Sequence, residues 1–109
     1  MAYDEKLAER IRTKLKGTRG LTEKKMFGGV GFLINGNMSC GVHKQAMIVR
    51  LSNEDSDAAL KLPHVKLFDM TGRPMKGWIM VEQQGTSSDK AVQGWVEKGV
   101  AYASSLPPK

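Results

Sequence analysis

Two residues that could form a nucleophile and its base lie close together in the sequence, at Cys40 and His43. A thiol beside an imidazole can act in covalent catalysis, and the same two ligands could begin a metal site. His64 is the only other histidine and there is no second cysteine, so a tetrahedral Cys/His zinc site cannot be completed. Cys40 is expected to share one face of a strand with Met38 and Val42, and residues three apart on a strand point to opposite faces. We therefore expect a buried, unreactive Cys40, no catalytic residues and no bound metal.

A glycine-rich stretch, GGVG at residues 28–31, raises the alternative of a phosphate-binding loop. Such loops place their glycines between a strand and a helix whose N-terminus meets the phosphate. Here the apolar residues 32–34 follow, and then Asn35-Gly36, which is typical of a type I′ hairpin turn. We therefore expect a bulge or kink where one strand bends, or a point where a helix packs close, at these glycines. No cofactor is expected.

The chain is basic, with a formal net charge of +6. Its densest positive cluster, called the basic cluster below, consists of Arg10, Arg12, Lys14, Lys16 and Arg19. A basic surface of this kind can bind nucleic acid through phosphate contacts. Glu5 and Glu9 are interspersed with it, however, as on an ordinary solvated helix face. We favour the solvated face and keep nucleic-acid binding as the alternative.

Arg73 lies between Gly72 and Pro74 in an irregular segment. Segments of this kind carry function more often than regular elements do. The other interpretation is a turn with a solvated or locally paired arginine. Gly72, Arg73 and Pro74 are our candidates for contact with a partner protein.

Hydrophobic periodicity indicates where helices must lie. Tyr3, Leu7, Ile11 and Leu15 recur every four residues and predict a helix over residues 3–16. A short helix follows Ser52 or Asn53, and a longer one follows a capping box formed by Thr86 and Asp89. The apolar stripe of this last helix contains Gly99, which indicates a close approach to the sheet. The other apolar positions of this stripe are Val92, Trp95, Val96, Tyr102, Ala103 and Leu106.

Short alternating segments predict the strands. They begin at residues 26–27, continue at 32–34 and 38–43, and return at 47–52. Residues 62–75 are expected to hold an edge strand and a turn, and residues 77–81, apolar on both faces, an interior strand. The predicted fold class is α+β with two layers, an antiparallel meander sheet of four to five strands with the N-terminal and C-terminal helices packed against it. One domain, residues 1–109, is expected from the length.

The sequence has no long apolar run, no signal-peptide pattern and a single cysteine. These features predict a cytoplasmic protein with no membrane partner.

The segments KKMFGGVGFLINGNMSCGV, MIVRL, TGRPMKGWIMVE and WVEKGVAYASSLPP occur in this order and cover much of the chain. Together they resemble the TfoX/Sxy N-terminal domain family of bacteria. The resemblance implies a compact two-layer α+β domain and no catalytic motif. Named members regulate natural competence together with a cyclic-AMP-responsive transcription activator, and longer members carry a second, helical domain. The residues that match the family pattern are Met26, Phe27, Gly28, Gly29, Gly72, Arg73 and Pro74, to which the pattern assigns no chemistry.

These observations favour a non-catalytic regulatory or protein-interaction module, whose sheet edges could pair with a partner protein or with a second copy in a homodimer. Direct nucleic-acid binding is the alternative. An enzyme is the third hypothesis, which would need a concave pocket that brings Arg73 together with His43 or His64.

Overall fold

A computed structural model describes residues 3–26, 29–68 and 75–107 of the chain. The elements are α1 (Glu5–Leu15), β1 (Leu21–Met26), β2 (Gly29–Ile34), β3 (Asn37–His43), β4 (Ala46–Arg50), α2 (Asn53–Ala59), β5 (Val65–Phe68), β6 (Met75–Val81), the 3-10 helix η1 (Gln83–Thr86) and α3 (Asp89–Ser105). The strands form one six-stranded sheet in the order β1-β2-β3-β4-β6-β5, and every neighbouring pair is antiparallel.

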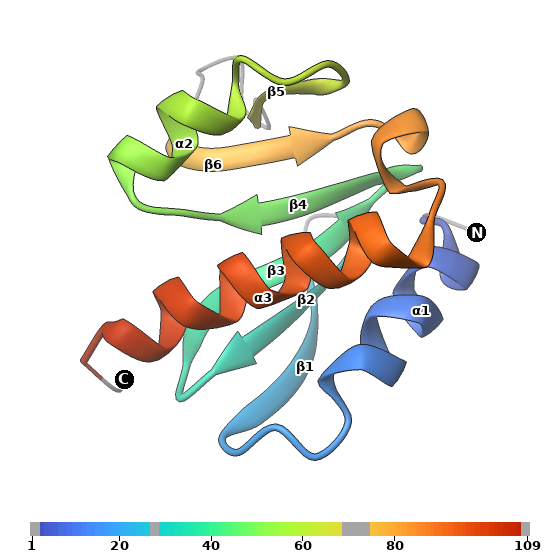
Figure 1. The fold of residues 1–109 in the computed structure, drawn as a ribbon. Coiled ribbons are helices and arrows are strands. Elements are labelled where there is room, and N and C mark those ends of the chain that lie inside the picture. The colour runs from blue at the N-terminus through green and yellow to red at the C-terminus, as the bar shows by residue number, and fades with distance from the viewer. Residues whose placement is uncertain (1–2, 27–28, 69–74, 108–109) are drawn as a thin grey trace.

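All three helices contribute to one core on one face of the sheet. Ile11 of α1, Ala59 of α2 and Val96 of α3 belong to the same buried cluster as Val42 of β3 and Ile79 of β6. In Figure 1, α3 lies across the middle of the sheet, with α1 beside it and α2 next to β6. The predicted α+β class and the packing of the terminal helices against an antiparallel sheet are confirmed. Among the described residues, no helix covers the opposite face, which we call the open face.

The sheet has six strands rather than the predicted four to five, and its order is not a simple meander. The extra length is β1, a six-residue strand that we expected to be a short piece at residues 26–27. Its sequence, LTEKKM, is mostly polar, as is common for strands at the edge of a sheet. Such a strand lacks the hydrophobic alternation from which strands are predicted. After α2 the chain first forms the edge strand β5, and β6 then enters between β4 and β5. The predictions of an edge strand within residues 62–75 and of an interior strand at 77–81 are confirmed.

Gly29 of β2 and Gly41 of β3 allow these two strands to approach closely. A Cβ atom on Gly29 would overlap the carbonyl oxygen of Val42, and one on Gly41 would overlap that of Val30. The ladder between β2 and β3 also shifts register at Phe32, as at a β-bulge. The interpretation as a structural bend is therefore confirmed for the described part of the stretch, whereas Phe27 and Gly28 lie outside the described residues.

Local signals set most of the remaining boundaries. The Asn35-Gly36 turn has φ angles of 52° and 85°, as a type I′ turn requires. Ser52 caps α2 as predicted, its hydroxyl accepting from the Asp55 amide at 3.1 Å. The predicted capping box at Thr86 is wrong: Ser88 caps α3 by accepting from the amide of Ala91, while Thr86 ends η1. Ser88 can take this role because its own backbone is extended, as at an N-cap.

The contact between α3 and the sheet depends on Gly99. A Cβ atom at Gly99 would overlap the carbonyl oxygen of Ser39 in β3, so the predicted close approach is confirmed. Gly94 lies one and a half turns earlier on α3, and a Cβ atom there would have no neighbour within 4 Å. Both glycines lie in α3, but only at Gly99 does packing against the sheet require a residue without a side chain.

We predict opposite effects for alanine at these two positions. Gly99→Ala should lower the free energy of unfolding by about 1–3 kcal/mol, because the helix must move off the sheet. Gly94→Ala, the matched control, should raise it by about 1 kcal/mol through helix propensity alone. Urea unfolding followed by circular dichroism measures both values. Equal effects of the two substitutions would show that the approach at Gly99 does not limit packing.

Candidate functional site

Cys40 lies in the hydrophobic core and not in a site. It is fully buried among residues of α1, α3 and the central strands. Burial raises the pKa of the Cys40 thiol to about 12, and the nearest polar partner is the Ser39 hydroxyl, 3.8 Å from the sulfur. A neutral, inaccessible thiol is a poor nucleophile, so the predicted role as a small buried hydrophobe is confirmed.

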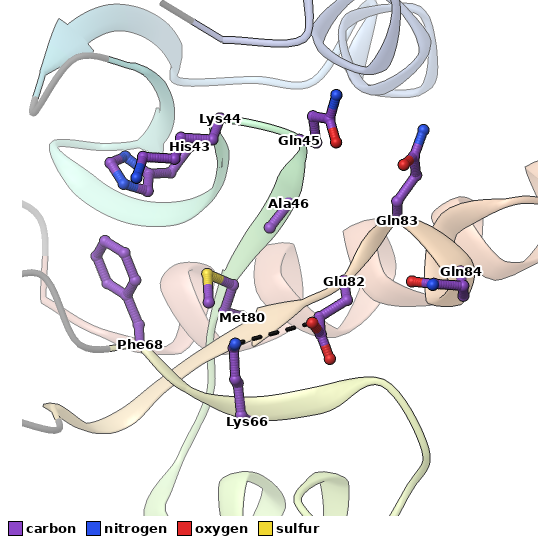
Figure 2. A pocket seen from close by; sticks show the side chains of 10 residues that line it. All are labelled: His43, Lys44, Gln45, Ala46, Lys66, Phe68, Met80, Glu82, Gln83 and Gln84. Carbon is purple, nitrogen blue, oxygen red and sulfur yellow. Dashed lines mark ion pairs between the residues drawn. The ribbon is translucent and has the colours of Figure 1, made fainter.

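His43 belongs to the opposite side of the sheet from Cys40. It ends β3 and lines a pocket with Phe68 of β5 and Met80 of β6, and α3 passes behind these strands in Figure 2. The His43 and Phe68 rings meet edge to face, with their centres 5.7 Å apart. Strand geometry therefore separates the thiol from the imidazole, as the alternation predicted.

The open face holds this pocket where the β3–β4 turn approaches β5 and the end of β6. Its volume is about 490 Å³. Its lining residues are His43, Lys44, Gln45, Ala46, Lys66, Phe68, Met80, Glu82, Gln83 and Gln84. The volume of this pocket is within the usual range of small-molecule sites. It is our candidate functional site.

The polar rim of the pocket carries more positive than negative charge. Lys66 and Glu82 approach with 3.7 Å between Nζ and Oε2, and both side chains are about half exposed. Lys44 forms no ion pair among the described residues. The Nδ1 atom of His43 is buried and has no hydrogen-bond partner among them.

The structure divides the basic cluster into paired and exposed residues. Arg12 forms two hydrogen bonds with Glu23, at 2.7 and 2.9 Å, and a third with Glu9. Arg10 pairs with Asp89 of α3 at 3.1 Å. The other three members are Lys14, which is half-buried, and the exposed Lys16 and Arg19. Two of the five cations therefore connect α1 to neighbouring elements, which the sequence did not indicate.

Other predicted sites can be placed only in part. Gly72, Arg73 and Pro74 lie outside the described residues. His64 is exposed at the start of β5 and does not line the pocket. Within residues 3–26, 29–68 and 75–107, no group of three or more His, Cys, Asp or Glu side chains is arranged to hold a metal ion. No helix in this part of the chain is long and apolar enough to cross a membrane.

Comparison with protein families gives a match to most of the chain. The model of the TfoX N-terminal domain matches residues 13–103. The chain belongs to the TfoX N-terminal domain family. This domain is associated with regulators of competence and transcription and is not a known catalytic family. No curated protein and no solved structure matches the chain.

The pocket of this TfoX N-terminal domain was not recognisable from the sequence. Its residues come from the β3–β4 turn, from β5 and from the end of β6, which the sheet order brings together. The sequence suggests partners for His43 only in Cys40, which does not line the pocket, and Arg73, which lies outside the described residues. The only part of the pocket that the sequence indicates is the turn at residues 43–45. A turn signal does not show that residues of β5 and β6 lie opposite it.

We predict that Cys40 does not react in the folded protein. Native protein treated with a thiol reagent such as DTNB should stay unlabelled, and denatured protein should be labelled fully, because only unfolding exposes the sulfur and restores its ordinary pKa. Fast labelling without denaturant would contradict the buried position. The Cys40→Ser variant provides the zero-label control.

The ion pair of Arg12 and Glu23 should contribute pH-dependent stability. The hydrogen bond from Arg12 lowers the pKa of Glu23 below its ordinary value of 4.5. The contribution is therefore complete above that value and is lost as the pH falls through the lower pKa of the folded state. Glu23→Gln should reduce the free energy of unfolding by about 0.5–1 kcal/mol at pH 7, as for other exposed pairs.

At pH values below the ordinary pKa range of carboxyl groups, the difference in the free energy of unfolding between Glu23→Gln and the wild type should disappear. Asp57→Asn, on the exposed surface of α2, is the control with the same change of net charge. Urea unfolding from pH 3 to 7 measures both variants. A Glu23→Gln effect that does not change with pH would contradict the assignment.

Proposed function

We propose that this TfoX N-terminal domain is a non-catalytic protein-binding module, which receives an extended, acidic segment of a partner protein along β5. The observation that carries the proposal is that β5 is an apolar strand at the edge of the sheet. A partner strand can satisfy the free backbone groups of such an edge, while its side chains provide specificity.

The two edges of the sheet differ in their suitability for strand addition. On β1, the residues Glu23, Lys24 and Lys25 are exposed and charged, and charges on an edge oppose pairing. On β5, Val65 and Leu67 are only half-buried and uncharged. The β5 edge is therefore the more receptive one.

The hydrogen-bond register indicates which groups β5 offers. The Glu82 amide donates to the His64 carbonyl at 2.8 Å, and Lys66 is opposite Met80 two residues further on. In an antiparallel ladder, hydrogen-bonded and non-hydrogen-bonded pairs alternate. Val65 and Leu67 therefore turn their N–H and C=O groups away from β6, toward the position that a partner strand would occupy.

Charge supports the choice of an acidic partner. Lys61 and Lys66 are exposed before and within β5, and the chain as a whole has a net charge of +6. An acidic segment would be attracted to this edge, and charge complementarity contributes to specificity and to the association rate.

The competing hypotheses have less support. Among the described residues, the thiol is buried and no metal-binding group of side chains occurs, so an enzyme has no evident nucleophile or metal centre. Nucleic-acid binding through the basic cluster would have to use cations that are partly engaged, because Arg10 and Arg12 already pair with acidic residues.

We predict that proline at position 67 abolishes partner binding while the domain stays folded. Leu67→Pro removes an outward-facing N–H, and proline is tolerated on edge strands for this reason. Leu67→Ala, the control, removes more of the apolar side chain than proline does but keeps the N–H. Tagged wild type and both variants are used to capture proteins from native cells, and circular dichroism verifies folding.

Any protein lost with Leu67→Pro and retained with Leu67→Ala is then purified, and hydrogen exchange of the complex is measured. The expected result is slowed exchange of the Val65 and Leu67 amides. The proposal fails if protection lies elsewhere, for example on α1, or if the only species bound at β5 is a second copy of the chain. It also fails if a folded Leu67→Pro domain retains every partner.

A further inference from the structure

The pocket on the open face has features that strand addition at β5 does not use. It is about 490 Å³ in volume, and it combines an apolar base with a charged rim. We propose that it binds a small organic anion with a planar apolar body, such as an aromatic carboxylate. This inference does not require the proposed protein binding, although Lys66 contributes to both.

The base of the pocket is suited to a flat apolar group. Ala46, Phe68 and Met80 come from three adjacent strands, and each is buried or half-buried. Figure 2 shows the Phe68 ring standing beside His43 at one end and Met80 between Phe68 and Glu82. Aromatic rings and a methionine sulfur give favourable contacts to a planar ligand. These side chains therefore favour an aromatic or similarly flat body.

The rim favours a negatively charged group on that body. Two lysines, Lys44 and Lys66, line the pocket together with a single acidic residue, Glu82. The Lys66–Glu82 contact is long, at 3.7 Å, and both partners are about half exposed, so Lys66 can turn toward a ligand at little cost. The excess of one positive charge matches a monoanion.

The backbone of Lys44 is held in place by the N-terminal segment. Its φ angle is 56°, in the left-handed region, and its carbonyl accepts a 2.7 Å hydrogen bond from the Asp4 amide. The backbone of this turn is therefore fixed before any ligand arrives, and less order has to be imposed on binding.

One polar atom in the pocket wall lacks a partner. His43 Nδ1 is buried and makes no hydrogen bond with any described residue. Because this atom is inaccessible to solvent, a ligand in the pocket cannot reach it, and hydrogen bonds to a ligand must come from the side chains around the opening. The amides of Gln45, Gln83 and Gln84 add further donors and acceptors around the opening. The site is therefore suited to a ligand with both an anionic and a hydrogen-bonding group.

The test uses 2-naphthoate as the anionic probe and 2-naphthamide as its neutral counterpart, each titrated into ¹⁵N-labelled protein. We expect 2-naphthoate to shift the amide signals of Ala46, Phe68 and Met80. We expect 2-naphthamide to bind about threefold or more weakly, the ratio typical of one partly exposed ion pair.

Lys66→Gln should weaken 2-naphthoate by about threefold or more and leave 2-naphthamide unchanged. Lys90→Gln, on the exposed surface of α3, has the same change of net charge and should have no effect. The proposal is overturned if 2-naphthoate shifts no pocket signal, if both probes bind equally, or if the two lysine variants weaken binding alike. Because no partner protein is present, this outcome is separate from the test of β5.

Discussion

The close contact of α3 with the centre of the sheet is the constraint on which the rest of the structure depends. At Gly99 the helix reaches the carbonyl oxygen of Ser39, a distance that no side chain would allow. This contact lets Trp95 and Val96 enter the same core as α1 and α2. One face of the sheet is thereby closed, and among the described residues the other face has no helix.

The difference between the two faces separates the reactive groups. Cys40 points into the covered face, where burial raises the pKa of its thiol to about 12. His43 points to the open face, where it meets Phe68. The alternation of side chains along β3 therefore keeps Cys40 and His43 apart and places the His43 imidazole in the pocket.

The order of the strands decides which residues lie at the two edges of the sheet. Because β6 enters between β4 and β5, the strand at this edge is the short, apolar β5 rather than β6. The same crossing places Lys66 and Phe68 beside the β3–β4 turn. At the other edge, β1 carries exposed lysines, and Glu23 is held by Arg12 of α1. The two edges of one sheet thus have different chemistry.

The sequence by itself determined the features that local physics controls. Apolar spacing located the helices, Asn35-Gly36 located the hairpin, and alternation separated Cys40 from His43, since each of these depends on neighbouring residues alone. Gly99 on an apolar stripe even predicted the close helix–sheet contact. Only the tertiary structure showed β1, the position of β6 and the pocket. A polar edge strand has no hydrophobic period, and strand order and a pocket built from three segments depend on contacts between residues far apart in the chain.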